Sequence, residues 1–211
     1  MSTSNSVLSL VVDGVAKSYG RHRVLADVSF GLRAGTVAGI IGENGSGKST
    51  LLNILAGRLR PDAGEIRCSG RIGYCPQELL LFESLTVQEN FHYFATAYGL
   101  EAPGAPDWRG AQEALLSWFR FESAAGVPVS RLSGGTKQKL NLALALLAAP
   151  DVLILDEPYS GFDWETYLRF WEYTAEMRRR GRTTLIVSHL VFDRAQFDAL
   201  YRLEKGILEC A

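Results

Sequence analysis

Val37-Ala-Gly-Ile-Ile-Gly-Glu-Asn-Gly-Ser-Gly-Lys-Ser-Thr50 is the stretch that decides the fold of this 211-residue chain. The apolar run Val37–Ile41 predicts a buried strand, and residues 51–55 carry apolar side chains at helical spacing. The pattern Gly42-x-x-x-x-Gly47-Lys48-Ser49 therefore lies between a strand and a helix. This is the setting in which the pattern forms a phosphate-binding loop.

Each part of this loop has a chemical task in holding a nucleotide. Its glycines let backbone N–H groups approach phosphate oxygens because no Cβ stands in the way. The N-terminus of the following helix attracts anions. We expect Lys48 to reach the β- and γ-phosphates and the Ser49 hydroxyl to bind Mg²⁺. The predicted nucleotide-binding residues are Gly42, Glu43, Asn44, Gly45, Ser46, Gly47, Lys48, Ser49 and Thr50.

Composition sets outer limits on the class of protein. The chain is 47% hydrophobic and 21% charged, which fits one globular domain with a sizeable core. The net charge of -1 gives no general attraction to nucleic acid. Three cysteines without metal-ligand spacing favour a reducing cytoplasm. No apolar run approaches the ~20 residues of a membrane span, so we expect any role at a membrane to work through a partner.

The rest of the chain predicts an α/β core interrupted by a helical segment. Strands are expected at residues 7–12, 24–30, 71–74, 152–155 and 183–188, and a final hairpin at residues 199–209. Helices are expected at residues 87–98 and 111–121, with prolines and a glycine between them. We therefore predict one domain over residues 1–211, with its core at about 1–77 and 126–211 and a helical lobe at about 78–125.

Two acids follow the most apolar of these strands. Four apolar residues in series, 152–155, suit a strand that is buried on both faces of a parallel sheet. Carboxylates at its end, Asp156 and Glu157, are costly to bury unless they meet a metal or a reacting group. With a phosphate loop present, we expect Asp156 on the Mg²⁺ side and Glu157 polarising the attacking water. The alternative is a solvated strand end.

Five other features keep two interpretations open on their chemistry alone. Tyr19, in an expected turn at residues 17–20, is a half-buried strand residue or a face on which adenine stacks. Gln77 is an exposed loop residue or faces a nucleotide, and His189 is structural or donates to a phosphate. Ser133-Gly134-Gly135 is an ordinary capped helix start or a second anion-binding helix N-terminus. Leu79-Leu80-Leu81-Phe82 packs under the helical lobe or forms a docking surface.

In their order along nearly the whole chain, these motifs resemble those of the ATP-binding-cassette (ABC) ATPases, specifically the nucleotide-binding subunit of a transporter. The resemblance implies a P-loop NTPase (RecA-like) core with an antiparallel β subdomain and an inserted α-helical subdomain. The matching motifs are Gly42 to Ser49 as Walker A, Gln77 as the Q-loop glutamine, Leu132-Ser133-Gly134-Gly135 as the family signature, residues 152–156 with Glu157 as Walker B and catalytic glutamate, Ser160-Gly161-Phe162-Asp163 as the D-loop, His189 as the switch histidine, and Tyr19 as the adenine-stacking aromatic.

Two positions depart from the common family pattern. The signature continues as Thr136-Lys137-Gln138-Lys139 where many members have glutamine directly after the glycines. This variant resembles the subunits paired with separately encoded export permeases. Phe162 replaces the usual leucine of the D-loop, an apolar change that we expect to be tolerated.

The resemblance also implies a mechanism. ATP and Mg²⁺ on the loop of one cassette are capped by Ser133, Gly134 and Gly135 of a second, in a head-to-tail homodimer or heterodimer. The implied catalytic residues are Glu157, His189, Gln77 and Lys48, and the implied metal ligands are Ser49, Gln77 and Asp156. A membrane permease is expected to dock near Gln77 and Leu79 to Phe82, which places the chain peripherally at the cytoplasmic face of the membrane.

Two alternative functions compete with transport. ABC ATPases that act on DNA or ribosomes carry long coiled coils or two cassettes in one chain, and neither feature is present in this near-neutral sequence. A module that never hydrolyses ATP conflicts with the joint presence of Glu157, Gln77 and His189.

Overall fold

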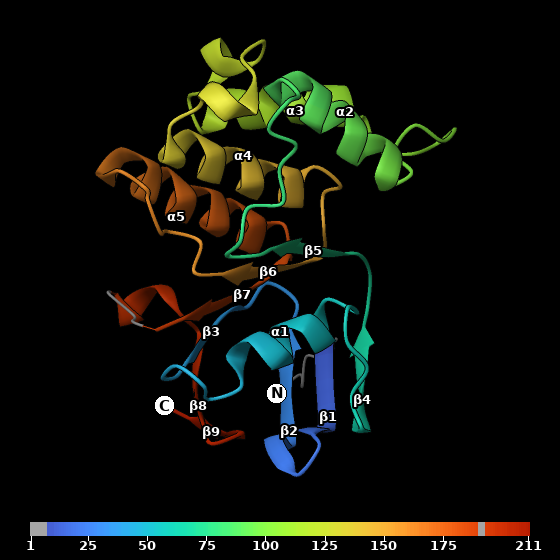
Figure 1. The fold of residues 1–211 in the computed structure, drawn as a ribbon, viewed down its shortest axis with the longest axis vertical. Coiled ribbons are helices and arrows are strands. Elements are labelled where there is room, and N and C mark those ends of the chain that lie inside the picture. Colours follow the sequence, from blue (N-terminus) through green and yellow to red (C-terminus); the bar gives the residue numbers. More distant parts are fainter. Residues whose placement is uncertain (1–7, 190–192) are drawn as a thin grey trace, which may run out of the picture.

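A six-stranded sheet divides the molecule into a helical half and a half that carries a second sheet (Figure 1). The computed structural model describes residues 8–189 and 193–211. Neighbouring strands are parallel except for β8 and β9, which form the expected final hairpin. In spatial order the strands are β5 (Ile72–Cys75), β6 (Val152–Asp156), β7 (Thr183–Ser188), β3 (Val37–Ile41), β8 (Ala199–Glu204) and β9 (Ile207–Cys210).

Strand β6 shows why the sheet lies in the middle of the molecule. Successive side chains of a strand point to opposite faces. Leu153 and Leu155 accordingly join the apolar cluster on the helical side, and Val152 and Ile154 join the cluster on the other side. All four side chains are buried. The continuous apolar run thus fills two cores at once, as the sequence predicts.

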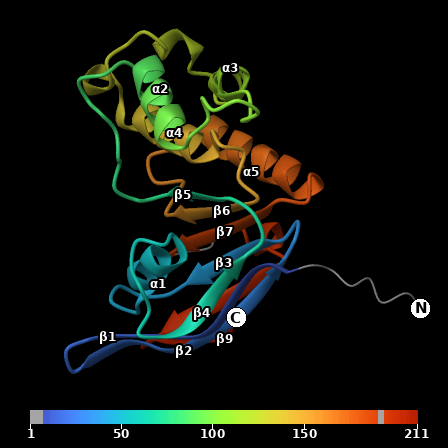
Figure 2. The same ribbon diagram turned by 90° about the vertical axis from the view of Figure 1, so that its right-hand side faces the viewer.

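The second half of the molecule places one helix between two sheets. Helix α1 (Lys48–Leu55) lies between the parallel sheet and a three-stranded antiparallel sheet (Figure 2). That sheet has the order β2 (His22–Arg33), β1 (Leu8–Tyr19) and β4 (Ala63–Cys68). The prediction of a turn at residues 17–20 is wrong for residues 17–19, because β1 continues to Tyr19. Tyr19 pairs with His22 of β2.

The helical half is stacked in two layers above the parallel sheet (Figure 1). Helices α4 (Gly134–Leu146) and α5 (Trp164–Arg179) form the layer nearer the sheet, with α2 (Val87–Ala97) and α3 (Trp108–Trp118) beyond them. The described residues also contain three short 3-10 helices, Glu122–Ala124, Val129–Arg131 and Arg194–Gln196. The fold class predicted from the sequence is confirmed, whereas the exact limits of the helical lobe stay a prediction.

The helical elements show two further features. Helix α3 starts three residues before the sequence prediction because the Asp107 carboxylate accepts the Gly110 N–H and caps the helix there. No helix within residues 8–189 or 193–211 combines the length and the apolar character that crossing a membrane requires.

Asn90 fixes the connection between the sheet and α2. Its side chain is fully buried, although asparagine is polar. Its Oδ1 accepts the Phe82 N–H at 2.9 Å, and its Nδ2 donates to the carbonyls of Phe82 and Thr86 at 3.1 and 2.9 Å. One side chain therefore satisfies several backbone groups of the segment that leads from Gln77 to the lobe.

We predict that Asn90→Ala lowers the free energy of unfolding by about 1–3 kcal/mol, because it leaves buried backbone groups without partners. Urea unfolding followed by circular dichroism measures this. Gln88→Ala, on the exposed side of the same helix, is the matched control and should change stability by less than about 0.5 kcal/mol. Equal effects of the two substitutions would contradict this role of Asn90.

Candidate functional site

The register of three parallel strands brings the predicted site residues to one edge of the sheet. Ile41, the last residue of β3, pairs with Ser188 of β7, and Asp156 of β6 pairs with Val187. Gly42, Glu157 and His189 come directly after these strand ends. Carboxyl ends of parallel strands are where α/β proteins bind ligands. The structure therefore collects the loop, the acids and the histidine in one place.

The loop at residues 42–47 adopts a backbone shape that requires glycine. Gly45 and Gly47 have φ values of 79° and 108°, which side chains rarely adopt. A Cβ at Gly42 would overlap the Leu203 carbonyl oxygen, so the loop passes close to β8. Glu43, Asn44, Gly45 and Ser49 are exposed, Gly42 and Thr50 are intermediate, and Ser46, Gly47 and Lys48 are buried.

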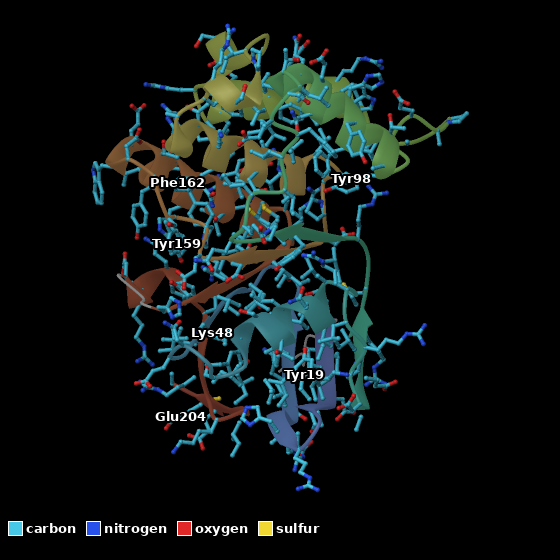
Figure 3. All side chains as sticks on the ribbon, viewed as in Figure 1. Tyr19, Lys48, Tyr98, Tyr159, Phe162 and Glu204 are labelled. Atoms are coloured by element: carbon cyan, nitrogen blue, oxygen red, sulfur yellow. The ribbon has the colours of Figure 1, made fainter. Side chains whose placement is uncertain are left out.

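Lys48 lies folded over this loop. Its Nζ donates to the carbonyl oxygens of Gly42 and Glu43 at 2.7 and 2.8 Å. Burial lowers the pKa of Lys48, and the nearby charges of Glu157 and Asp156 oppose that shift. The ammonium group of Lys48, which Figure 3 labels, is thus bonded to loop carbonyls and lies near enough to both acids to be influenced by their charge.

The two acids differ in their surroundings. Burial raises the pKa of Asp156 to about 6, the Glu157 charge adds to this shift, and Lys48 and His189 oppose it. Glu157 is held at both oxygens: Oε2 accepts the Ser188 hydroxyl at 2.7 Å and Oε1 accepts the His189 backbone N–H at 2.6 Å. Its backbone has φ 48°, an uncommon conformation for a residue with a side chain. The Glu157 carboxylate is therefore fixed in direction.

His189 closes this edge of the site. Its Nδ1 lies 3.3 Å from the Gly42 carbonyl oxygen and its Nε2 lies 3.6 Å from Glu157 Oε1. The ring is therefore between the start of the loop and the carboxylate. A hydrogen-bond donor in this position can face a phosphate bound on the loop.

The residues predicted to bind Mg²⁺ offer oxygen donors, which this ion prefers. Within the described part of the chain, no three His, Cys, Asp or Glu side chains gather closely enough to hold a metal by themselves. Mg²⁺ at a nucleotide site is usually held by one or two carboxylates together with phosphates, so the set fits. Asp156 is half-buried, Ser49 is exposed at the first turn of α1, and Gln77 is exposed two residues beyond β5.

Tyr19 lies at the exposed end of β1. Its ring is 54% exposed, and Lys17 Nζ lies 6.0 Å from the ring centroid. Tyr19 and Lys48 are both in the half of the molecule that contains α1 (Figure 3). The residue is thus part of a strand, as one interpretation holds, and it keeps an accessible aromatic face, as the other requires. Its role in stacking stays a prediction.

Ser133, Gly134 and Gly135 start α4, on the opposite side of the parallel sheet from α1 (Figure 1). The Ser133 hydroxyl oxygen accepts the Thr136 N–H at 3.2 Å and caps the helix. Ser133 and Gly134 are exposed, and a Cβ on Gly134 would meet no atom within 4 Å. No hydrogen bond recorded for residues 8–189 and 193–211 joins these three residues to the phosphate loop. The phosphate loop and the predicted second anion-binding helix start therefore lie apart in one chain.

The β8–β9 turn supports the loop, a contact that no local sequence pattern indicates. The Gly206 N–H donates to the Ser46 carbonyl at 3.2 Å, and the Gly206 carbonyl accepts the Ala26 N–H at 2.8 Å. A Cβ on Gly206, which has φ 80°, would overlap the Val24 carbonyl. The pattern Glu204-Lys205-Gly206 indicates a hairpin turn but not which loop the turn touches.

A cavity of about 860 Å³ opens beside the loop. His189 lines it together with residues 41–46, and β8 contributes Arg202 and the residues that follow it. Lys48, Ser49, Asp156 and Glu157 do not line this cavity. The cavity therefore borders the predicted site on the side of β8 and does not enclose it.

Comparisons with known proteins point to one family. A family model described as "ABC transporter" matches residues 25–160. The chain is 39% identical over 191 residues to "Nod factor export ATP-binding protein I" of Paraburkholderia xenovorans (strain LB400), which covers 85% of this chain and 62% of that protein. The chain therefore spans less than two thirds of this relative's length.

Solved structures agree on the fold. A structure described as the ATP-binding subunit of an ABC transporter aligns with a TM-score of 0.89 at 28% identity and covers 97% of this chain and 90% of that one. A dimeric ATP-binding cassette in a post-hydrolysis state, bound to ADP and Pi, aligns with a TM-score of 0.84 at 24% identity, with coverage of 95% and 96%.

We predict that Gly206→Ala weakens ATP binding about tenfold or more, because the added methyl group displaces the turn that holds Ser46. Titration with a fluorescent ATP analogue measures the dissociation constant. Gly104→Ala is the matched control, since Gly104 also lies in a turn with a positive φ of 81° but has no atom within 4 Å of its Cβ position. Equal loss of binding in both variants would contradict the support role.

We also predict that Asp156→Asn raises the melting temperature of the nucleotide-free and magnesium-free protein by a few degrees at pH 8. The folded protein holds the Asp156 proton more tightly than the unfolded chain, with a pKa of about 6 against 3.8. Ionisation therefore costs stability as the pH rises through 6. The advantage of the variant should fade as the pH falls from 7 to 4, and a pH-independent difference would contradict it.

Proposed function

The chain belongs to the ABC transporter family as one of its ATP-binding cassettes, and on this premise we propose that it hydrolyses ATP to power export through a separate membrane permease. Cassettes of this family are ATPases. The observation that carries the proposal is the Glu157 carboxylate, fixed by Ser188 and His189 beside the Lys48 loop. A base held in one direction next to a phosphate cradle suits attack by water.

Export, and not another use of ATP, is supported by the relatives. The matching family is described as a transporter family, and the relative described above is named an export ATP-binding protein. These names favour transport over the alternative of an ATPase acting on DNA or ribosomes. Because the match covers 62% of that relative, its transported compound is not carried over to this chain.

Hydrolysis at this site needs positioned charge more than covalent chemistry. Lys48 neutralises phosphate oxygens, and Glu157 orients or deprotonates the attacking water. His189 donates to the γ-phosphate from the side of Gly42. Mg²⁺, held by Ser49, Asp156 and Gln77, would neutralise charge on the β- and γ-phosphates when bound. Tyr19 stacks on the adenine ring.

The site is completed by a second cassette. Ser133, Gly134 and Gly135 lie across the sheet from the loop of their own chain, so they cap ATP only on a partner. A head-to-tail pair places backbone donors and a hydroxyl at the γ-phosphate. ATP then favours the closed pair because it contacts both chains only in that state. A dimeric cassette among the solved structures of this fold supports the pairing.

The permease docks at the segment that follows β5. Leu80 and Phe82 are 46% and 39% exposed, and Phe82 packs on Tyr93 with ring centroids 4.2 Å apart. Leu80 also lines a groove of about 430 Å³ between the parallel sheet and the helical lobe. Apolar side chains at a groove edge suit a docked helix. We infer that a cassette docked in this way lies at the cytoplasmic face of the membrane.

We predict that Glu157→Gln lowers the ATP turnover number by about 10²–10⁴-fold while ATP binding is kept, because it removes the general base only. Steady-state phosphate release measures turnover, and light scattering in the presence of ATP detects a persistent dimer.

Glu65→Gln is the control, since Glu65 forms an exposed ion pair with Arg67 on β4. Strand β4 belongs to the antiparallel sheet and not to the parallel sheet that carries Glu157. It should leave turnover unchanged. Turnover of Glu157→Gln at the rate of the unmodified protein would remove Glu157 from its catalytic role.

A further inference from the structure

Helix α5 begins with an exposed aromatic patch, formed by Trp164, Tyr167 and Leu168. Trp164 is 72% exposed and Leu168 is 45% exposed, and the two lie one helical turn apart. Among residues 8–189 and 193–211, Trp164 has the largest exposed fraction of any large apolar side chain. Its ring stacks on Tyr167 at 5.5 Å with 17° between the planes. Exposed apolar groups of this kind mark contact surfaces.

The patch is rigidly mounted. The Asp163 carboxylate accepts the Thr166 N–H at 2.7 Å and caps α5. Tyr167 packs edge-on against Tyr159 at 5.7 Å, and the ring of Phe162 lies 6.2 Å from that of Phe170. The chain before and after Trp164 is thus anchored in the helical-side core, and the indole itself is exposed.

The patch continues the surface that carries Ser133, Gly134 and Gly135. A Cβ on Gly135 would lie 3.0 Å from the Gly161 carbonyl oxygen, so the loop before α5 touches the start of α4. The same loop begins directly after Glu157, and the Ser160 N–H donates to the Glu157 carbonyl at 3.2 Å. The aromatic patch therefore borders the half-site that a partner's ATP must reach.

The patch does not belong to the permease surface. Phe162, which directly precedes the α5 cap, and Tyr98, which lines the groove beside Leu80, lie on opposite sides of the helical half (Figure 3). One rim of the patch is charged, because Glu165 pairs with Arg120 at 2.6 Å and with Arg169 at 3.2 Å. An aromatic centre with a charged rim is the usual anatomy of a protein–protein interface.

We propose that this aromatic patch is buried by a second copy of this chain when ATP closes the pair. The inference rests on the proposed function and extends it, because it assigns an anchor outside the nucleotide-contacting motifs. Trp164 is a positioning residue for the pair and touches no phosphate. A tryptophan anchor strengthens the closed state without altering the ATP contacts of a single chain.

Acrylamide quenching of tryptophan fluorescence tests the proposal on the full chain carrying Glu157→Gln. Trp108 and Trp171 are 6% and 9% exposed and Trp118 is half-buried, so Trp164 dominates collisional quenching. Subtracting the fluorescence of the double variant Glu157→Gln/Trp164→Phe isolates the contribution of Trp164. MgATP should lower the Trp164 quenching constant several-fold, in step with dimer formation measured by light scattering.

A second variant measures the strength of the anchor. Trp164→Ser should raise the protein concentration needed for half-maximal dimer formation about tenfold or more, as expected for an interface tryptophan. Leu8→Ser, at a side chain 44% exposed on β1, is the matched control and should leave that concentration unchanged. ATP binding to the monomer should be equal in all three proteins.

Two contrary results are distinguishable. A dimer that forms with ATP while Trp164 quenching and the half-maximal concentration stay unchanged overturns the patch and leaves the proposed function standing. If ATP induces no dimer at any protein concentration, the shared nucleotide site of the proposed function is overturned. The burial of the patch by a second copy of the chain is then overturned with it.

Discussion

The parallel pairing of β6, β7 and β3 is the constraint on which the rest of the structure depends. Their register sets Asp156 beside Val187 and Ile41 beside Ser188, and this alone brings Gly42, Glu157 and His189 to a common edge. The pairing is possible because both faces of the sheet are covered, by α4 and α5 on one side and by α1 with the antiparallel sheet on the other. The geometry of the candidate site is thus a result of core packing.

That edge holds an arrangement of charge that is not optimal for the stability of the isolated chain. Asp156 is a carboxylate whose pKa is raised to about 6, and Lys48 has a pKa lowered by burial. Both shifts mean that the folded chain disfavours the charged forms which nucleotide chemistry uses. Phosphates and a divalent cation would supply the missing opposite charges. Ligand binding therefore relieves electrostatic cost in the protein itself.

The sequence predicts the fold class and most elements because their signals are local. The strands Val37–Ile41 and Thr183–Ser188 have the predicted bounds. The residues of the phosphate loop are identified from the spacing of the glycines and the lysine in the motif. The continuation of β1 to Tyr19 was missed because Lys17, Ser18 and Tyr19 alternate too weakly to outweigh a nearby glycine. The Gly206 contact and the exposure of Trp164 depend on tertiary packing, to which no local pattern corresponds.

The contact of Gly206 with Ser46 and Ala26 has a consequence for synthesis on the ribosome. The phosphate loop and α1 leave the exit tunnel early, but β8 and β9 lie at residues 199–210. Until those strands emerge, the loop has neither the β8 carbonyl that packs on Gly42 nor the turn that holds Ser46. A nascent chain thus has its loop sequence long before the residues that support the loop, and the supported loop can form only after residue 206 has emerged.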